Sequence, residues 1–192
     1  MKKLFAVMMV LALVVLLPFS LASSAEEKTA KGRVELGGNV GFTHSSYEGG
    51  SITDIAVMPR LGYFVIPKLE LEPTLLVSNT SYSPDGGDSY SGTEFGLIFN
   101  VAYHFESASE SKLVPFIFAG LGFASYSGDY YGDDTEMSMI MPDVGGGVKY
   151  FITNSALIRG EAFWEHVTNE SGMKDNDADH FGIRAGVSIF VK

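Results

Sequence analysis

Apolar and polar residues alternate with a period of two along most of this chain, and the pattern is clearest in its last twelve residues. Between Phe181 and Lys192 one set of alternate positions is wholly apolar, whereas the other holds small residues with Arg184, Phe190 and Lys192. A period of two is typical of a β-strand whose two faces differ. Small residues with an arginine suit a narrow polar interior, so we interpret the segment as a membrane-barrel strand with its apolar face outward.

The same alternation recurs in earlier segments of the chain. Eight segments in all predict an all-β fold, an eight-stranded antiparallel up-and-down transmembrane β-barrel. One of them, residues 112–126, is apolar on both sets of positions, so the pattern does not say which of its side chains point outward. We expect strands over residues 33–45, 54–63, 69–82, 93–104, 112–126, 140–150, 155–167 and 181–192.

Three prolines fall inside these expected strands, and the connections between the strands alternate in length. Because proline cannot donate to a strand ladder, we expect bulges or strand ends at Pro59, Pro73 and Pro142. Loops rich in Gly, Asp and Ser follow the first, third, fifth and seventh segments, and tight turns follow the others. Outer-membrane barrels have this asymmetry, with short periplasmic turns and longer external loops.

Aromatic residues precede each short turn, where a membrane-interface girdle would place them. The other reading is that aromatic residues favour strand ends in any β protein. The residues concerned are Tyr63 and Phe64, Tyr103 and Phe105, and Tyr150 and Phe151.

The first 25 residues have the pattern of a secretory signal peptide. Lys2 and Lys3 precede an uncharged apolar run over residues 4–17, which is short for a membrane-spanning helix. Small residues ending at Ala25 fit cleavage before Glu26, and a retained anchor is the alternative. We expect a signal peptide at residues 1–25 and one barrel domain at residues 26–192.

Charge limits the partners that this chain can bind, and cysteine content limits how the chain can be stabilised. The full chain carries a formal charge of −10, and residues 1–25 hold two Lys and no acid, which leaves eleven basic against twenty-three acidic residues. So acidic a chain is a poor partner for nucleic acid. The chain has no cysteine, so an exported domain of this sequence depends on hydrogen bonding and packing alone, as a closed barrel does.

Three segments carry a resemblance to a known family: residues 113–123 (LVPFIFAGLGF), 145–151 (GGGVKYF) and 159–161 (RGE). The chain resembles the small eight-stranded outer-membrane barrels of the OmpA/OmpX type over essentially all of residues 26–192. The resemblance implies the outer membrane of a Gram-negative-type bacterium, a porin-like envelope protein and insertion by the barrel assembly machinery. Such barrels usually end in an aromatic residue. Here Val191 and Lys192 follow Phe190, so either the register shifts near the end or the insertion signal is atypical.

The inward positions of the expected strands gather charged residues of both signs. An eight-stranded barrel is about wide enough for side chains to fill its interior, so we expect ion pairs that plug the lumen; proton or cation passage is the alternative. The expected lumen network comprises Glu35, Asp54, Arg60, Glu70, Glu72, Glu94, Asp143, Lys149, Arg159, Glu161, Glu165 and Arg184.

Two motifs suggest other chemistry. The segment from Glu165 to Asn169 resembles the His-x-Ser-Asn pattern of PagL-type lipid A deacylases, which implies His166 as base and Thr168 in place of the serine nucleophile. Acids alternate over residues 175–179, but the glycine and the final glutamate of an EF-hand loop are missing. We therefore expect no metal and no cofactor.

The sequence thus predicts a non-enzymatic outer-membrane barrel with a structural or surface-interaction role. Expected partners are outer-membrane lipid and lipopolysaccharide, the assembly machinery, and an extracellular ligand at the acidic loops. The Tyr-, Ser- and Gly-rich loops at residues 82–90 and 125–131 suit such recognition. The alternatives are the PagL-type deacylase and a soluble periplasmic ligand-binding barrel similar to lipocalins.

Overall fold

A computed structural model describes residues 28–47, 50–84, 86, 89–105, 112–130, 133–169 and 178–191. The expected signal peptide lies outside these residues. The strands are β1 (Val34–Tyr47), β2 (Gly50–Ile66), β3 (Leu69–Pro84), β4 (Tyr90–His104), β5 (Leu113–Tyr130), β6 (Asp133–Phe151), β7 (Ala156–Asn169) and β8 (Ala178–Val191).

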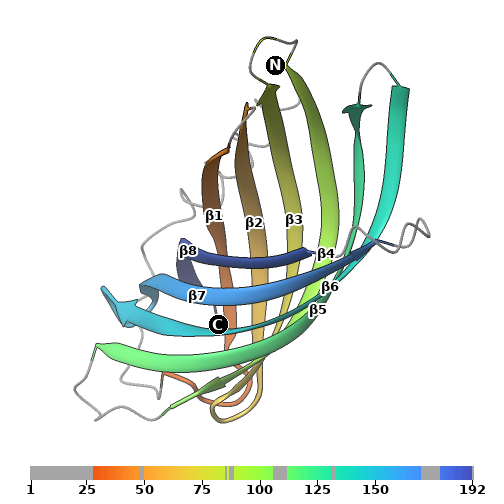
Figure 1. Cartoon of the computed structure of the whole chain (residues 1–192). Coiled ribbons are helices and arrows are strands. Elements are labelled where there is room, and N and C mark those ends of the chain that lie inside the picture. Colours follow the sequence, from red (N-terminus) through yellow and green to blue (C-terminus); the bar gives the residue numbers. More distant parts are fainter. Residues whose placement is uncertain are drawn as a thin grey trace.

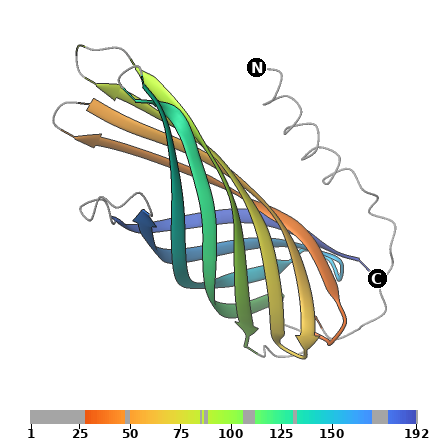
Figure 2. The same cartoon turned by 90° about the vertical axis from the view of Figure 1, so that its right-hand side faces the viewer.

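These strands form a closed antiparallel barrel, which confirms the predicted fold. Each strand pairs with the next along the chain, and β1 pairs with β8 from Val34↔Val191 to Val40↔Ala185. The strands are strongly inclined, so those on opposite walls cross in Figures 1 and 2. In the described part of the chain no helix is both long and apolar enough to cross a bilayer.

The two faces of the wall have opposite polarity. In β8 the outward side chain of Ile183 is 82% exposed and that of Val187 is 53% exposed, whereas Arg184 between them is buried. The same alternation shows which side chains of β5 point inward, since Phe116 and Phe118 are buried. A soluble ligand barrel has the reverse polarity, so that alternative is wrong.

The expectation of bulges or strand ends at the three prolines is wrong. Pro59, Pro73 and Pro142 all lie within continuous strands. Each coincides with a short gap in pairing on one side, yet the register is the same before and after the gap, as at Ile140↔Thr168 and Asp143↔Glu165 around Pro142. A missing N–H removes ladder bonds locally, while the closed wall holds the alignment.

Four of the six aromatic residues expected in the girdle lie on the outer face. Tyr63, Tyr103, Tyr150 and Phe105 are all exposed on the outer face. Phe64 and Phe151, in contrast, are buried inside the barrel. Successive side chains of a strand point to opposite faces, so neighbouring aromatic residues cannot share the girdle.

Phe190 keeps the inward facing that the alternation gives it. It pairs with Glu35 of β1 without a register shift and is 6% exposed. Its ring stacks on that of Phe151 at a centroid distance of 5.7 Å. The register shift that we considered near the end of the chain is therefore excluded.

Several segments expected to be loops are paired strand ends. β5 and β6 are 18 and 19 residues long and pair as far as Tyr130↔Asp133, so most of the expected loop at residues 127–135 is strand. This hairpin extends well beyond β7 and β8 in Figure 1. β1 and β2 likewise pair through the expected loop at residues 46–51.

Because the chain has no cysteine, single spin labels can test this polarity. A label at Ile183→Cys in lipid vesicles should collide readily with dissolved oxygen and little with an aqueous nickel chelate. A label at Asn154→Cys, in the short β6–β7 turn, should behave oppositely. Electron paramagnetic resonance relaxation measures both, and preferential quenching at residue 183 by the nickel chelate would contradict the outward facing of β8.

Candidate functional site: the charged lumen

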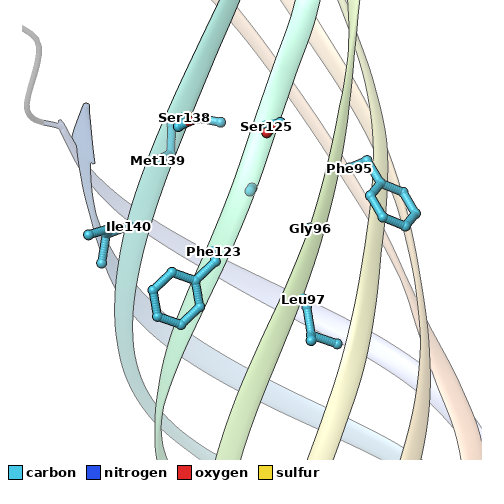
Figure 3. A pocket seen from close by; sticks show the side chains of 9 residues that line it. Phe95, Gly96, Leu97, Phe123, Ser125, Ser138, Met139 and Ile140 are labelled. Atoms are coloured by element: carbon cyan, nitrogen blue, oxygen red, sulfur yellow. The ribbon is translucent and has the colours of Figure 1, made fainter. Parts of the chain in front are cut away.

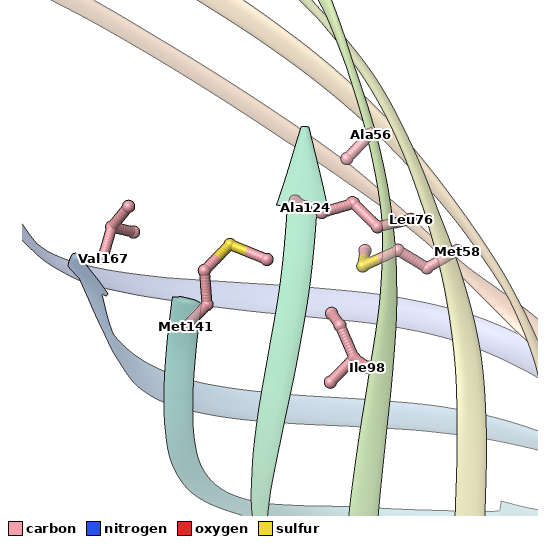
Figure 4. Packing of buried hydrophobic residues seen from close by; sticks show 7 residues of the cluster. All are labelled: Ala56, Met58, Leu76, Ile98, Ala124, Met141 and Val167. Atoms are coloured by element: carbon pink, nitrogen blue, oxygen red, sulfur yellow. The ribbon is translucent and has the colours of Figure 1, made fainter. Parts of the chain in front are cut away.

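Three apolar clusters lie inside the described part of the barrel. Ala102, Phe116 and Phe118 form one among the charged side chains, and the other two form layers, one toward the short turns and one toward the long hairpins. The short-turn layer consists of Phe64, Val114, Phe151, Leu157 and Phe190. The layer toward the long hairpins is larger, and Figure 4 shows its side chains converging from neighbouring walls. It consists of Ala56, Met58, Leu76, Ile98, Ala124, Met141 and Val167.

Charged side chains fill the lumen between these layers, beginning next to the short-turn layer. Lys149 of β6 donates to Glu35 Oε2 at 2.7 Å and to Glu70 Oε2 at 2.6 Å. Arg60 of β2 bridges Glu35 and Glu72, with 2.5 Å between Nη1 and Glu72 Oε1. All five residues are at most 5% exposed, so each charge depends on its partners rather than on water.

Arg159 of β7 continues the network across the lumen. It donates to both carboxylate oxygens of Glu72, at 2.5 and 3.1 Å, in the two-pronged geometry that guanidinium groups favour. Its Nε contacts Glu161 Oε2 at 2.5 Å. Glu72 thus accepts hydrogen bonds from Arg60 of β2 and from Arg159 of β7.

Arg184 of β8 forms the last, looser part of the network. Its guanidinium nitrogens lie 3.6 to 3.8 Å from carboxylate oxygens of Asp143, Glu161 and Glu165. The guanidinium also sits 3.6 Å above the ring centroid of Phe163. Aromatic faces attract cations most strongly when desolvated, so the lumen rings stabilise charge as well as filling space.

Glycines on the inner wall make room for these side chains. A Cβ at Gly62 would overlap Oε1 of Glu70, and one at Gly120 would overlap Oδ1 of Asn100 and Oδ1 of Asp143. Glycine at these two inward positions therefore leaves the space that the neighbouring polar side chains occupy.

Ten of the twelve expected lumen residues lie in this one ion-paired network. The other two lie nearer the long hairpins and contact hydroxyl groups: Asp54 accepts from Thr80 at 2.9 Å, and Glu94 accepts from Ser78 at 3.2 Å. The alternation alone did not single out the neutral members of the lumen. These include Asn39, which donates to Glu161; Ser188, which accepts from Arg60; and the fully buried His104.

The second set of expected site residues lies on the outer face of β7. His166 Nδ1 lies 2.9 Å from Asp179 Oδ1 of β8, and the ring of His166 stacks on Trp164. Thr168 is two residues along the same face. The acidic segment 170–177 lies outside the described residues.

A shallow groove runs along the outer wall close to this pair. Phe95 and Leu97 of β4 line one side, Phe123 and Ser125 lie along β5, and Ile140 forms part of the other side, as Figure 3 shows. Ile140 pairs directly with Thr168. The groove and the His166–Asp179 pair are therefore adjacent on the lipid-facing surface.

The fold and the lumen match a known family. The family model described as the outer membrane protein beta-barrel domain matches residues 10–189. The chain belongs to this family. As a member of the outer membrane protein β-barrel family, the chain resides in the outer membrane of a Gram-negative-type bacterium. Among curated protein sequences, none matches it significantly.

Solved structures of outer-membrane barrels share the fold at low sequence identity. Neisserial surface protein A has 22% identity and a TM-score of 0.54, covering 82% of this chain and 95% of that one. OprG from Pseudomonas aeruginosa has 12% identity and a TM-score of 0.55, covering 86% and 99%. A major outer membrane protein from Thermus thermophilus has 14% identity and a TM-score of 0.52, covering 83% and 99%.

The network predicts a large difference between two glutamates of the same lumen. Glu72→Gln should lower the free energy of unfolding by about 3–5 kcal/mol, because Arg60 and Arg159 would lose the carboxylate that pairs them. Glu94→Gln, whose described side-chain partner is a hydroxyl, should cost less than about 1 kcal/mol. Urea unfolding in lipid vesicles, followed by heat-modifiable migration, measures both; equal losses would contradict the network.

Proposed function

We propose that this barrel is a non-enzymatic envelope protein whose lumen is plugged by its own side chains. The observation that carries the proposal is the ion-paired network lying between two apolar layers. An ion crossing the lumen would have to pass the short-turn layer, which contains Phe64, Phe151 and Phe190, and then displace paired charges. Desolvating an ion among apolar side chains is costly, so the arrangement opposes conduction.

The surface role follows from the polarity of the outer wall and the long hairpins. The exposed apolar band suits contact with outer-membrane lipid and, toward the hairpins, with lipopolysaccharide. The hairpins carry acidic, Tyr-, Ser- and Gly-rich segments such as residues 82–90 and 125–131, which suit an extracellular ligand. The barrel assembly machinery is the proposed partner for insertion, and the acidic composition argues against nucleic acid.

Planar-bilayer recording tests the plug. The purified full chain should give conductance close to that of the bare membrane, with no stable single-channel steps. Phe64→Ala should also stay silent, because the ion-paired network still fills the lumen beside it. Insertion is verified in parallel by heat-modifiable migration, and reproducible channel steps from the inserted wild-type chain would overturn the proposal.

The contact between His166 and Asp179 favours a second candidate, a PagL-type hydrolysis of ester-linked acyl chains. The carboxylate lies 2.9 Å from Nδ1, where it would orient the ring and stabilise its protonated form. Nε2 would then act as base toward the hydroxyl of Thr168. The adjacent groove lined by Phe95, Phe123 and Ile140 would hold an acyl chain.

Release of fatty acid from outer-membrane lipid, detected by mass spectrometry, tests this second candidate. If the barrel is a hydrolase, Thr168→Ala and His166→Ala should each abolish release. His180 of β8 is 57% exposed but lies beside Glu165 rather than on the face of His166, so His180→Ala should leave release unchanged. No release by the wild-type chain removes the candidate and leaves the plugged barrel.

A further inference from the structure

The ion-paired network contains more carboxylates than permanent cations. Its six acids are Glu35, Glu70, Glu72, Asp143, Glu161 and Glu165, and its four bases are Arg60, Lys149, Arg159 and Arg184. The acids therefore exceed the permanent cations by two charges, and an unbalanced buried charge is costly. Two of the acids, however, lie next to a histidine.

The two histidines differ in their access to water. Glu165 lies 3.7 Å from Nδ1 of His180, whose side chain is 57% exposed and exchanges protons with solvent. Glu70 Oε2 lies 3.3 Å from Nε2 of His104, and both side chains are 0% exposed. A proton at this second contact has to be held inside the barrel.

Both ring nitrogens of His104 lie close to groups that can only accept. The ring lies between Phe64 and Phe116, at centroid distances of 5.1 and 5.6 Å. Nδ1 lies 3.4 Å from the carbonyl oxygen of Lys68. Nε2 lies 3.3 Å from Glu70 Oε2 but has no hydrogen-bond partner among the described residues. A neutral imidazole has one N–H donor and a carboxylate has none, so satisfying both contacts needs one additional proton.

The short β2–β3 turn fixes this geometry. Lys68 occupies it with a φ of 71°, a left-handed conformation that non-glycine residues rarely adopt. Its carbonyl oxygen accepts from the backbone N–H of His104 at 2.8 Å. The ring therefore meets Lys68 through Nδ1, which leaves Nε2 on the side of Glu70.

We propose that the lumen contains a buried proton-binding site between His104 Nε2 and Glu70 Oε2. The charged groups facing it are Glu35 from β1, Arg60 from β2, Glu72 from β3, Lys149 from β6 and Arg159 from β7. With Glu70 and Glu161 these groups number four acids against three bases. One bound proton makes that half of the lumen neutral.

The site links folding to pH in a definite direction. In an unfolded chain, glutamate and histidine release their protons near pH 4.3 and 6.5. Between those values the unfolded pair holds one proton, as the folded pair does, so the pair contributes no pH dependence. Above about pH 6.5 only the folded pair keeps a proton, so stability falls as the pH rises.

Glu70→Gln tests the site, because the amide balances the charges without a proton. Urea unfolding of the full chain in lipid vesicles is measured from pH 5 to 9. The folding equilibrium constant of the variant should gain about tenfold on that of wild type for each pH unit above 7. Asp54→Asn, at a carboxylate that contacts the hydroxyl of Thr80 apart from the pair, should keep the wild-type pH profile.

A second variant keeps the test decisive if Glu70→Gln does not fold. His104→Phe retains the aromatic stack but leaves Glu70 to hold the proton alone, so the decline of stability should begin near pH 4.3 rather than 6.5. A wild-type stability that is flat from pH 7 to 9, or variants with the wild-type profile, would overturn the proposal.

Discussion

The structure depends on the pairing of charges inside a narrow closed wall. Water cannot solvate Glu72 or Arg159, which are 0% and 1% exposed, so each charge persists only where an opposite charge meets it. Such pairs contribute little net stability compared with apolar packing, yet breaking one is costly. The ion pairs therefore specify the arrangement of the barrel more than they add to its total stability.

What the charges specify is register. Adjacent pairs place Glu72, Asn100, Gly120, Asp143 and Glu165 in one row across five strands. A shift of one residue in any strand would turn its side chains to the other face, so an inward glutamate or arginine would meet lipid. This penalty explains how the wall keeps its alignment across Pro59 and Pro142, where ladder bonds are missing.

Facing could be predicted from the sequence, whereas pairing could not. A period of two assigns Glu72 and Arg159 to the same face, but they are 87 residues apart and nothing local says that they meet. The same rule excludes Phe64 and Phe151 from the girdle, although their aromatic character suggested the interface. The alternation gives His104 an inward position, yet its contact with Glu70 depends on the backbone of Lys68, which periodicity does not describe.

The wall also separates two kinds of chemistry that a single strand carries. β7 directs Arg159, Glu161 and Glu165 into the lumen and Trp164 and His166 to the outside. Inward changes disturb a network that fixes register, so these positions tolerate little. Outward changes meet only lipid or a neighbouring strand, so the surface around His166 can vary in chemistry while the barrel stays folded. Function in this fold can therefore change on the outer face without disturbing the ion-paired lumen.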